Sequence, residues 1–489
     1  MRAVADPPLI EGRRGRDYPP TAITAALASC GLICSYMQTL VVPLVPEWPR
    51  LLSTSSINAS WILTATLLGG AVCMPISGRL GDIFGKRRIA IFLLAGIALG
   101  SLLSAVSSSL APMIVGRTLQ GAGLGVIPLG ISMLRDSLPF DRLGRSVALM
   151  SSTLGVGAAV GIPLSATVSQ HHDWHWLFWA AMALSIVGAI ALWIVVPASP
   201  QHRGTRFDGF GAIGLALGLS GVLLAIAKGA DWGWTDRSSL GCAVGGLVVL
   251  LFWGFYQWKV TSPLVDLRVC TRRPVLLANL ASIAIAFGGF VPSVALPRLL
   301  QMQSTTGVGL GQSMVVSSMS LVSTGVVMMA ISPLAARLVT VRGPRTTLIC
   351  GAVAIILAYV FACLFMTEMW HTVVVGALVG VGTGLGYSSL PTVIMDSVPD
   401  GETASANGLN MLMRSIGTST ASAVAAALMA HNVVTVGSDD FTTAMGFRFV
   451  FALAGSAGCV ALLLVWFLPR QPRVHRRRVE AVSVPAADA

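Results

Sequence analysis

One short stretch of this chain combines a lone carboxylate, several cations and several glycines. Residues 78–88 read Gly-Arg-Leu-Gly-Asp-Ile-Phe-Gly-Lys-Arg-Arg. Glycines allow a tight reversal of the chain and a close approach of neighbouring helices. The carboxylate, Asp82, can bind a basic partner or the positive end of a helix, and either contact breaks when helices tilt. The stretch predicts a gating loop, with an ordinary basic loop as the alternative; its residues are Gly78, Arg79, Asp82, Gly85, Lys86, Arg87 and Arg88.

A second candidate is Arg117, which stands inside an apolar run together with Gln120. A cation within a membrane helix costs about 2.5–3.5 kcal/mol on insertion scales, so Arg117 should face a wet cavity or a polar partner rather than lipid. Gln120 lies one helical turn further on the same face. The pair is therefore a candidate for the wall of a substrate cavity. The alternative is an arginine packed between helices.

Polar residues also interrupt an apolar run near the C-terminus. Asn407, Asn410 and Arg414 follow i, i+3, i+7 spacing, which places them on one face of a helix. They either line the same cavity or form hydrogen bonds between helices, as polar groups inside membranes often do. Gln38 and Tyr387 are further candidates for the cavity wall.

Four residues of another apolar run favour close helix packing. Gly155, Gly157 and Gly161 leave room for a neighbouring backbone, and Pro163 can bend the helix. No cofactor is expected. The stretch from Gly81 lacks the Walker spacing. The histidine cluster at 171–175 lies among tryptophans typical of a membrane interface, so we expect no metal there.

The composition indicates which elements must position these groups. Hydrophobic residues make up 54% of the chain and charged residues 11%, far below the quarter that is usual in soluble proteins. About 20 apolar residues cross a bilayer as a helix. We therefore expect an all-α, polytopic membrane protein with 14 transmembrane helices, at roughly 22–45, 59–77, 89–108, 111–134, 146–168, 176–196, 208–228, 238–258, 274–297, 310–332, 346–366, 370–394, 404–430 and 446–468.

The basic residues predict an orientation. With the N-terminus inside, 25 of the 32 Lys and Arg fall in segments that face the cytoplasm, as the positive-inside rule requires. Both termini are then cytoplasmic. Basic loops facing an anionic leaflet of membrane lipids account for the net charge of +12, so no nucleic-acid partner is implied.

The chain also repeats itself. Pro75, Arg79, Gly85 and Arg87 return 258 positions later, and the Asp-Ser-Leu-Pro that begins at Asp136 returns 260 positions later as Asp-Ser-Val-Pro. Internal similarity between membrane halves is typical of secondary transporters. The offset spans eight helices, so two helices must separate two bundles of six. This 6+2+6 plan predicts a first bundle at 1–200, a two-helix insert with its linker at 201–273, a second bundle at 274–470 and a basic cytoplasmic tail at 471–489.

The stretch at 78–88 closely resembles the signature loop of the major facilitator superfamily. Gly78, Leu80, Asp82, Gly85, Arg87 and Arg88 fit that pattern, while Ile83 replaces its usual arginine. The Arg117-x-x-Gln-Gly element resembles one associated with proton coupling, and the Gly155 to Pro163 series resembles a motif of exporters. With fourteen helices the chain is most similar to the drug:proton antiporter branch. The resemblance implies a multi-pass carrier of the bacterial cytoplasmic membrane that exports amphipathic small molecules or antibiotics by alternating access, coupled to protons.

One departure from that branch bears on coupling. Many members carry an acid in the first helix, where this chain has Met37. None of the twenty Asp and Glu falls in the middle of a predicted span. If protons are used, Asp136 or Asp82 near Arg117 are the available acids, or the substrate itself carries the proton. A cavity with two arginines and no carboxylate should prefer neutral or anionic amphiphiles to permanent lipophilic cations.

Two other functions remain open. A nutrient or metabolite importer would share this fold, and the exporter-like series from Gly155 to Pro163 argues against it. A membrane-embedded enzyme that modifies lipids would need a nucleophile, base or metal clustered at one membrane face. The sequence shows no such cluster beyond the histidines, so we expect a transporter and not an enzyme.

Overall fold

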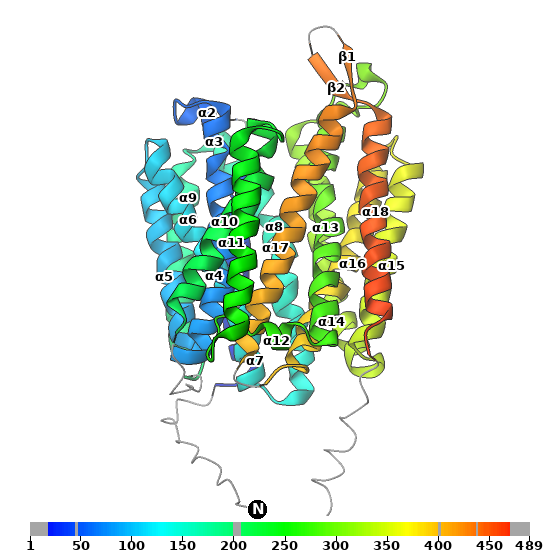
Figure 1. Ribbon diagram of the computed structural model, residues 1–489. Coiled ribbons are helices and arrows are strands. Elements are labelled where there is room, and N and C mark those ends of the chain that lie inside the picture. Colours follow the sequence, from blue (N-terminus) through cyan, green and yellow to red (C-terminus); the bar gives the residue numbers. More distant parts are fainter. Residues whose placement is uncertain (1–17, 45–46, 199–206, 400–401, 437–438, 470–489) are drawn as a thin grey trace, which may run out of the picture.

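The structure is a computed structural model that describes residues 18–44, 47–198, 207–399, 402–436 and 439–469 (Figure 1). The basic tail predicted at 471–489 lies outside the described residues. So do the first seventeen residues and most of the linker that precedes the two-helix insert.

Long helices run between the two ends of the molecule (Figure 1). In lipid, each backbone N–H and C=O must find its partner within the segment, which these apolar sequences achieve as helices. The long helices are α1 (Pro20–Thr39), α4 (Trp61–Phe84), α5 (Lys86–Ala105), α6 (Leu110–Ala122), α7 (Val126–Ser137), α8 (Phe140–His171), α9 (His175–Val195), α10 (Gly209–Trp232), α11 (Arg237–Lys259), α13 (Arg273–Gln301), α14 (Met314–Arg342), α15 (Pro344–Leu364), α16 (Met369–Met395), α17 (Thr403–His431) and α18 (Ala444–Trp466).

Shorter elements connect them. They are η1 (Val42–Leu44), α2 (Trp48–Leu51), α3 (Ser56–Ala59), η2 (Gly123–Gly125), α12 (Leu267–Cys270), η3 (Ser304–Thr306) and an antiparallel hairpin of β1 (Val433–Val436) and β2 (Asp439–Thr442). The 3-10 turn η2 joins α6 to α7, so the crossing predicted at 111–134 consists of two helices. Short 3-10 segments inside a helix often mark a bend.

The number of crossings agrees with the predicted fold. Thirteen helical segments of the described chain are long and apolar enough to span a membrane, with α6 and α7 counted together. The fourteenth crossing is α17, which has 29 residues but a more polar sequence that includes Asn407, Asn410 and Arg414. The protein is therefore an all-α, multi-pass membrane protein with a 6+2+6 arrangement.

The apolar cores follow the same division. One large core joins α1 and α4 to α9 and extends to Met395, Ala404 and Met411 of the second half. A second core joins α13 and α15 to α18, and Leu321 of α14 packs against it. A smaller third core surrounds α10, where Leu215 and Leu219 pack with Ala71 of α4 and Leu412 of α17. The insert of α10 and α11 thus lies against the line where the two halves meet, at the front of Figure 1.

The insert is attached to the first half by polar contacts as well. Lys228 of α10 is fully buried, and its ammonium donates to Ser60 and to Asp231, which lies 3.1 Å away. The same ammonium lies 5.1 Å from the centroid of the Trp61 ring. Ser60 and Trp61 form the start of α4, so a buried cation fastens α10 to that helix.

The predicted gating loop is not a loop, and in this respect the prediction was wrong. Helix α4 continues to Phe84, Gly85 alone turns the chain with φ 99°, and α5 begins at Lys86. Positive φ values strongly favour glycine. The repeat has the same geometry, because Gly343 with φ 88° separates α14 from α15. Asp82 therefore belongs to the last turn of a helix, which fixes its direction.

Glycines of α8 bring three helices into contact. A Cβ at Gly157 would lie 2.3 Å from Cβ of Ser35 in α1, and one at Gly161 would lie 2.4 Å from the Thr39 hydroxyl. At Gly155 the neighbour is Met328 of α14, in the other half, and a Cβ at Gly325 would lie 2.2 Å from the Gly155 carbonyl oxygen. Gly155 thus lies where the halves touch.

We predict that Gly157→Val lowers thermal stability. The new side chain must push α1 and α8 apart, and overpacking of this kind costs about 1–3 kcal/mol. The matched control is Gly96→Val in α5, where no atom lies within 4 Å of an added Cβ. The unfolding midpoints of both variants in detergent, followed by size-exclusion chromatography, test this. Equal losses in the two variants would show that valine in a helix, rather than the contact, is responsible.

Candidate functional site

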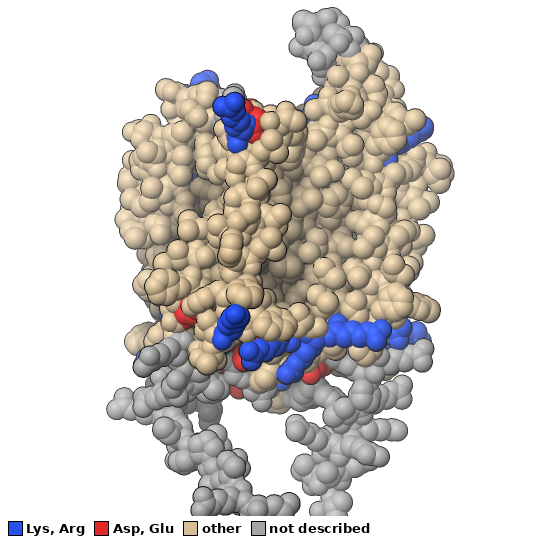
Figure 2. All heavy atoms as spheres, in the orientation of Figure 1, with Lys and Arg blue, Asp and Glu red and all other residues tan. Residues whose placement is uncertain are grey.

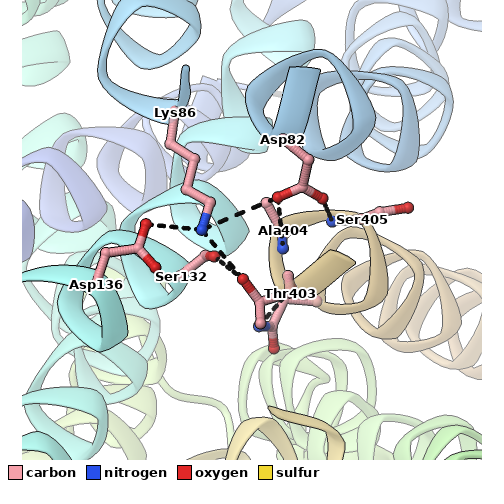
Figure 3. A network of polar contacts seen from close by, with 8 residues as sticks. Asp82, Lys86, Ser132, Asp136, Thr403, Ala404 and Ser405 are labelled. Atoms are coloured by element: carbon pink, nitrogen blue, oxygen red, sulfur yellow. Dashed lines mark hydrogen bonds and ion pairs between the residues drawn. The ribbon is translucent and has the colours of Figure 1, made fainter. Parts of the chain in front are cut away.

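The richest polar network lies at one end of the bundle, where α4 turns into α5. Figure 2 shows Lys and Arg gathered along this edge of the visible face, and we call it the basic end. Asp82 of α4 is only 3% exposed. It accepts hydrogen bonds from the backbone N–H groups of Ser405, at 2.9 Å, and Ala404, at 3.3 Å (Figure 3). These are in the first turn of α17, where unpaired N–H groups and the helix dipole favour an anion.

Lys86 connects this contact to the rest of the first half. Its ammonium lies 2.7 Å from Asp136 of α7 and 3.9 Å from Asp82 (Figure 3). It also donates to the hydroxyl of Thr403, at 3.1 Å. The side chain is nearly buried, so its three oxygen partners replace the water that an ammonium would otherwise bind. One lysine thus joins α5 and α7 to the start of α17.

The remaining contacts of the network also run between the halves. Ser132 of α7 shares a hydrogen bond with Thr403, and Arg135 donates to the backbone carbonyl of Met395 at the end of α16. Arg135 and Met395 are 260 positions apart. This equals the offset of the repeated Asp-Ser-x-Pro, so equivalent positions of the two halves meet here, as they do on a two-fold axis.

Small residues allow this end to close tightly. A Cβ at Gly78 would lie 2.5 Å from the carbonyl oxygen of Ala404, and one at Gly408 would lie 2.6 Å from that of Met74. Helices α4 and α17 therefore touch through their backbones. Together with the buried charges, this packing holds the two halves together at the basic end.

The other gating residues lie around the network. Arg79 is nearly buried in α4, and Arg88 is exposed. Arg87 donates to the carbonyl oxygen of Val196, at 2.8 Å, and so ties α5 to α9 within the first half. Glu402 precedes α17; burial raises the pKa of its carboxyl, with a contribution from Asp266, while Arg79 and Arg272 oppose the rise.

Arg117 does not face a wet cavity but is completely buried. Its guanidinium donates to the carbonyl oxygen of Met37, at 2.9 Å, and to the side chain of Gln120, at 2.6 Å. A third, longer contact reaches the carbonyl oxygen of Ile62, at 3.4 Å. Gln120 in turn donates to Ser101. Arg117 therefore has polar partners from α1, α4 and α6 and does not face lipid, as expected, and its part in substrate binding or coupling stays a prediction.

The expectation that Asp82 and Asp136 lie near Arg117 was wrong. Arg117 contacts Ile62 at the start of α4, whereas Asp82 lies twenty residues later in the same helix. At 1.5 Å per residue this is a separation of about 30 Å. Asp136 is bound to Lys86 at the basic end. Arg117 and the candidate acids thus lie at opposite ends of the first half.

In the second half the polar residues divide into two groups. Asn410 donates to Asn279, at 3.1 Å, and to Ser282, at 2.6 Å, and so joins α17 to α13. Asn407 donates to the carbonyl oxygen of Thr403 in its own helix. Hydrogen bonds between and within helices thus account for both amides. Arg414 lies over the ring of Tyr387, with its guanidinium 4.0 Å from the ring centroid.

The end opposite the basic end carries the histidine cluster. His175 bonds to Asp173, at 2.5 Å, and its other ring nitrogen lies 3.1 Å from the carbonyl oxygen of Ser107. The hydrogen bonds from His175 lower the pKa of the Asp173 carboxyl. Trp174 stacks on the His175 ring. Within the described ranges, no group of three His, Cys, Asp or Glu residues could hold a metal ion.

Sequence reasoning missed several members of these networks. Ser132 and Thr403 complete the contact with Lys86, and Asn279 and Ser282 receive Asn410. Single serines and asparagines in apolar runs give no pattern of their own. The repeated Asp-Ser-x-Pro was a usable signal, because it marks the segments that meet across the halves.

Gln38 is half-buried in α1, beside Met37.

Comparison with known proteins now adds to this geometry. The family model of the Major Facilitator Superfamily matches residues 27–421, and again residues 278–487. A "Multidrug resistance protein B homolog" of Mycobacterium tuberculosis is 25% identical over 430 residues, 85% of this chain and 78% of that protein. An "Uncharacterized MFS-type transporter YhcA" of Bacillus subtilis is 23% identical over 415 residues, 83% of this chain and 77% of that one.

Solved structures agree on the fold. The human organic anion transporter MFSD10 superposes with a TM-score of 0.64 at 14% identity, covering 92% of this chain and 100% of that one. The proton:xylose symporter XylE gives 0.63 at 15% identity, covering 92% and 96%. At such identities the likeness concerns the fold alone.

We predict that Asp82→Asn loosens the basic end. The amide cannot match the charge that α17 receives from the carboxylate, and hydrogen bonds to charged groups contribute about 1.5–3 kcal/mol each. The population in which this end is open should rise at least tenfold. Spin labels at the exposed positions Arg88 and Arg342, read by pulsed dipolar spectroscopy, measure it.

The control is Asp236→Asn, because Asp236 caps α11 by accepting from Ser238 and lies away from the contact between the halves. An unchanged distance distribution in Asp82→Asn would show that packing alone closes this end.

Proposed function

The chain belongs to the major facilitator superfamily, and from this we propose that it is a secondary transporter that exports amphipathic small molecules, antibiotics among them, across the bacterial cytoplasmic membrane. The observation that carries the proposal is the network around Asp82, which joins the halves at one end through contacts that a tilt can break. Alternating access needs such a reversible closure.

The direction of transport rests on two supports. Relatives over most of the chain are named multidrug resistance proteins, such as the homolog of Mycobacterium tuberculosis and the putative MdtD of Salmonella. The glycine series of α8, which resembles an exporter motif, packs against α14 of the other half. A nutrient importer stays the second candidate, because the xylose symporter shares the fold.

We further propose that the basic end faces the cytoplasm. Cytoplasmic loops carry an excess of Lys and Arg, which an anionic leaflet attracts. Helix α18 ends at this end in Figure 1, and the start of α1 lies beside the start of α8, where Thr24 and Ser146 share a hydrogen bond. The structure then corresponds to a carrier closed toward the cytoplasm.

For coupling, the proposal places the proton at the basic end. Asp82 and Asp136 share Lys86 there, so a proton on Asp136 would remove its ion pair with Lys86 and weaken the contact with Thr403. Loss of this pair would favour opening toward the cytoplasm. The second route is a substrate that carries its own proton.

We predict that Asp136→Asn uncouples export from the proton gradient. In inverted vesicles from cells that express the protein, substrate should enter against its gradient and dissipate an imposed pH difference. The variant should retain downhill flux but lose at least tenfold in pH-driven accumulation. Asp236→Asn serves as the control, since its carboxylate lies outside the network.

Two outcomes contradict parts of the proposal. Undiminished pH-driven accumulation in both Asp136→Asn and Asp82→Asn would move coupling to the substrate. Uptake into whole cells, rather than into inverted vesicles, would favour the importer. A deletion strain tested against chemically varied toxins at several external pH values gives the substrates for these assays.

A further inference from the structure

Arg414 is a buried cation that uses little of its hydrogen-bonding capacity. Its side chain is 4% exposed. One nitrogen, Nη2, donates to the carbonyl oxygen of Tyr387 at 3.3 Å, a long contact. The buried Nε and Nη1 have no acceptor among the described residues. An arginine carries five N–H donors, so most of them are unused here.

Arg117 offers a comparison within the same protein. It is more deeply buried, yet its Nη1 has two acceptors and its Nε has a third, so only Nη2 lacks a partner. The oxygens of Met37, Gln120 and Ile62 therefore accept three hydrogen bonds from Arg117 within the first half, whereas Arg414 donates one. Its role is to hold α1, α4 and α6 together, whereas Arg414 has donors to spare.

No carboxylate of the described residues forms an ion pair with Arg414. A buried charge without a counter-charge is costly, and removing one partner of a buried pair typically costs several kcal/mol. Such a cost is maintained where function needs the unpaired group. An anion that enters from solution would supply both the charge and the missing acceptors.

The position of Arg414 suits a transported anion. It lies eleven residues into α17 from the basic end, or about 17 Å along the helix. This is near the middle of a hydrocarbon core about 30 Å thick. Carriers built from two repeats hold substrate near that level, between the halves. Helix α17 is also the helix that packs on α4 of the first half.

Tyr387 orients the guanidinium. The guanidinium carbon of Arg414 lies 4.0 Å from the centroid of the Tyr387 ring, within the range of a cation–π contact, and the Tyr387 carbonyl oxygen accepts one hydrogen bond. A guanidinium held in this way keeps its remaining N–H groups in a fixed geometry, which favours planar oxyanions such as carboxylates.

We propose that Arg414, oriented by Tyr387, is the anion-recognition residue of this carrier, and that its preferred substrates are amphipathic molecules bearing a carboxylate. The inference rests on the proposed export function and specifies its substrate class. A fixed cation at this depth also disfavours permanently cationic amphiphiles, because like charges in a dry site repel strongly.

The test uses purified full-length protein in vesicles and a matched pair of probes, a dansylated amino acid and its methyl ester, with ethidium as a third. The wild type should transport the carboxylate at least tenfold faster than the ester and ethidium. Arg414→Gln should reduce carboxylate transport at least tenfold and leave ester transport within twofold. Arg414→Lys should recover part of the loss.

Further variants separate recognition from stability. Tyr387→Leu should raise the KM for the carboxylate with little effect on the ester, whereas Tyr387→Phe, which keeps the ring and the backbone carbonyl, should not. Arg448→Gln removes an exposed arginine of α18 and controls for loss of charge. Elution as a single species and an unchanged label distance at the basic end show that each variant is folded.

The outcomes separate the export function from the anion site at Arg414. Transport of none of the three probes by the wild type would overturn both the export function and the inference. Equal losses for all probes in Arg414→Gln, or faster transport of ethidium than of the carboxylate, would leave an exporter and overturn the anion site.

Discussion

The contact of Asp82 with the first turn of α17 is the constraint on which the rest of the structure depends. A carboxylate that is 3% exposed needs strong compensation, and the two N–H groups of Ala404 and Ser405 provide it together with Lys86. Each of these partners is held in place by another element. Lys86 needs Asp136 of α7, and the approach of α17 needs the missing side chains of Gly78 and Gly408. Helix packing and charge compensation therefore support each other at this end.

The two halves make equivalent helix contacts, but the chemistry of these contacts differs. At the repeat offset of 258, the position of Asp82 corresponds to Thr340 of α14. Asp82 meets the start of α17, the fifth crossing of the second half, and Thr340 lies near Gly144 of α8, the fifth crossing of the first. Equivalent contacts thus exist on both sides of the axis through Arg135 and Met395, but only one of them carries a charge.

Much of the fold could be predicted because a membrane helix is visible in the local sequence as a run of about 20 apolar residues. Apolar runs predicted the fourteen crossings. The glycines of 78–88 predicted a reversal of the chain, but not that α4 continues to Phe84 and that Gly85 alone makes the turn. The partner of Asp82 could not be predicted, since it lies 322 positions away and depends on how α4 and α17 pack. The error over Arg117 has a different origin. Arg117 and Asp136 belong to the same predicted crossing, so the helix rise of 1.5 Å per residue already places them far apart along it. The sequence could not show that Arg117 has more hydrogen-bond acceptors than Arg414, because those acceptors come from other helices.

The buried Lys228 determines which half of the protein holds the insert of α10 and α11 more firmly. Toward α4, α10 is fastened by the Lys228 ammonium, which donates to Ser60 and lies over the Trp61 ring, while Asp231 of α10 itself supplies the counter-charge. Toward α17 its described packing is through leucines, and smooth apolar surfaces slide past one another at small cost. Under the proposed alternating access, the insert of α10 and α11 should therefore move together with the first bundle, while α17 slides along α10.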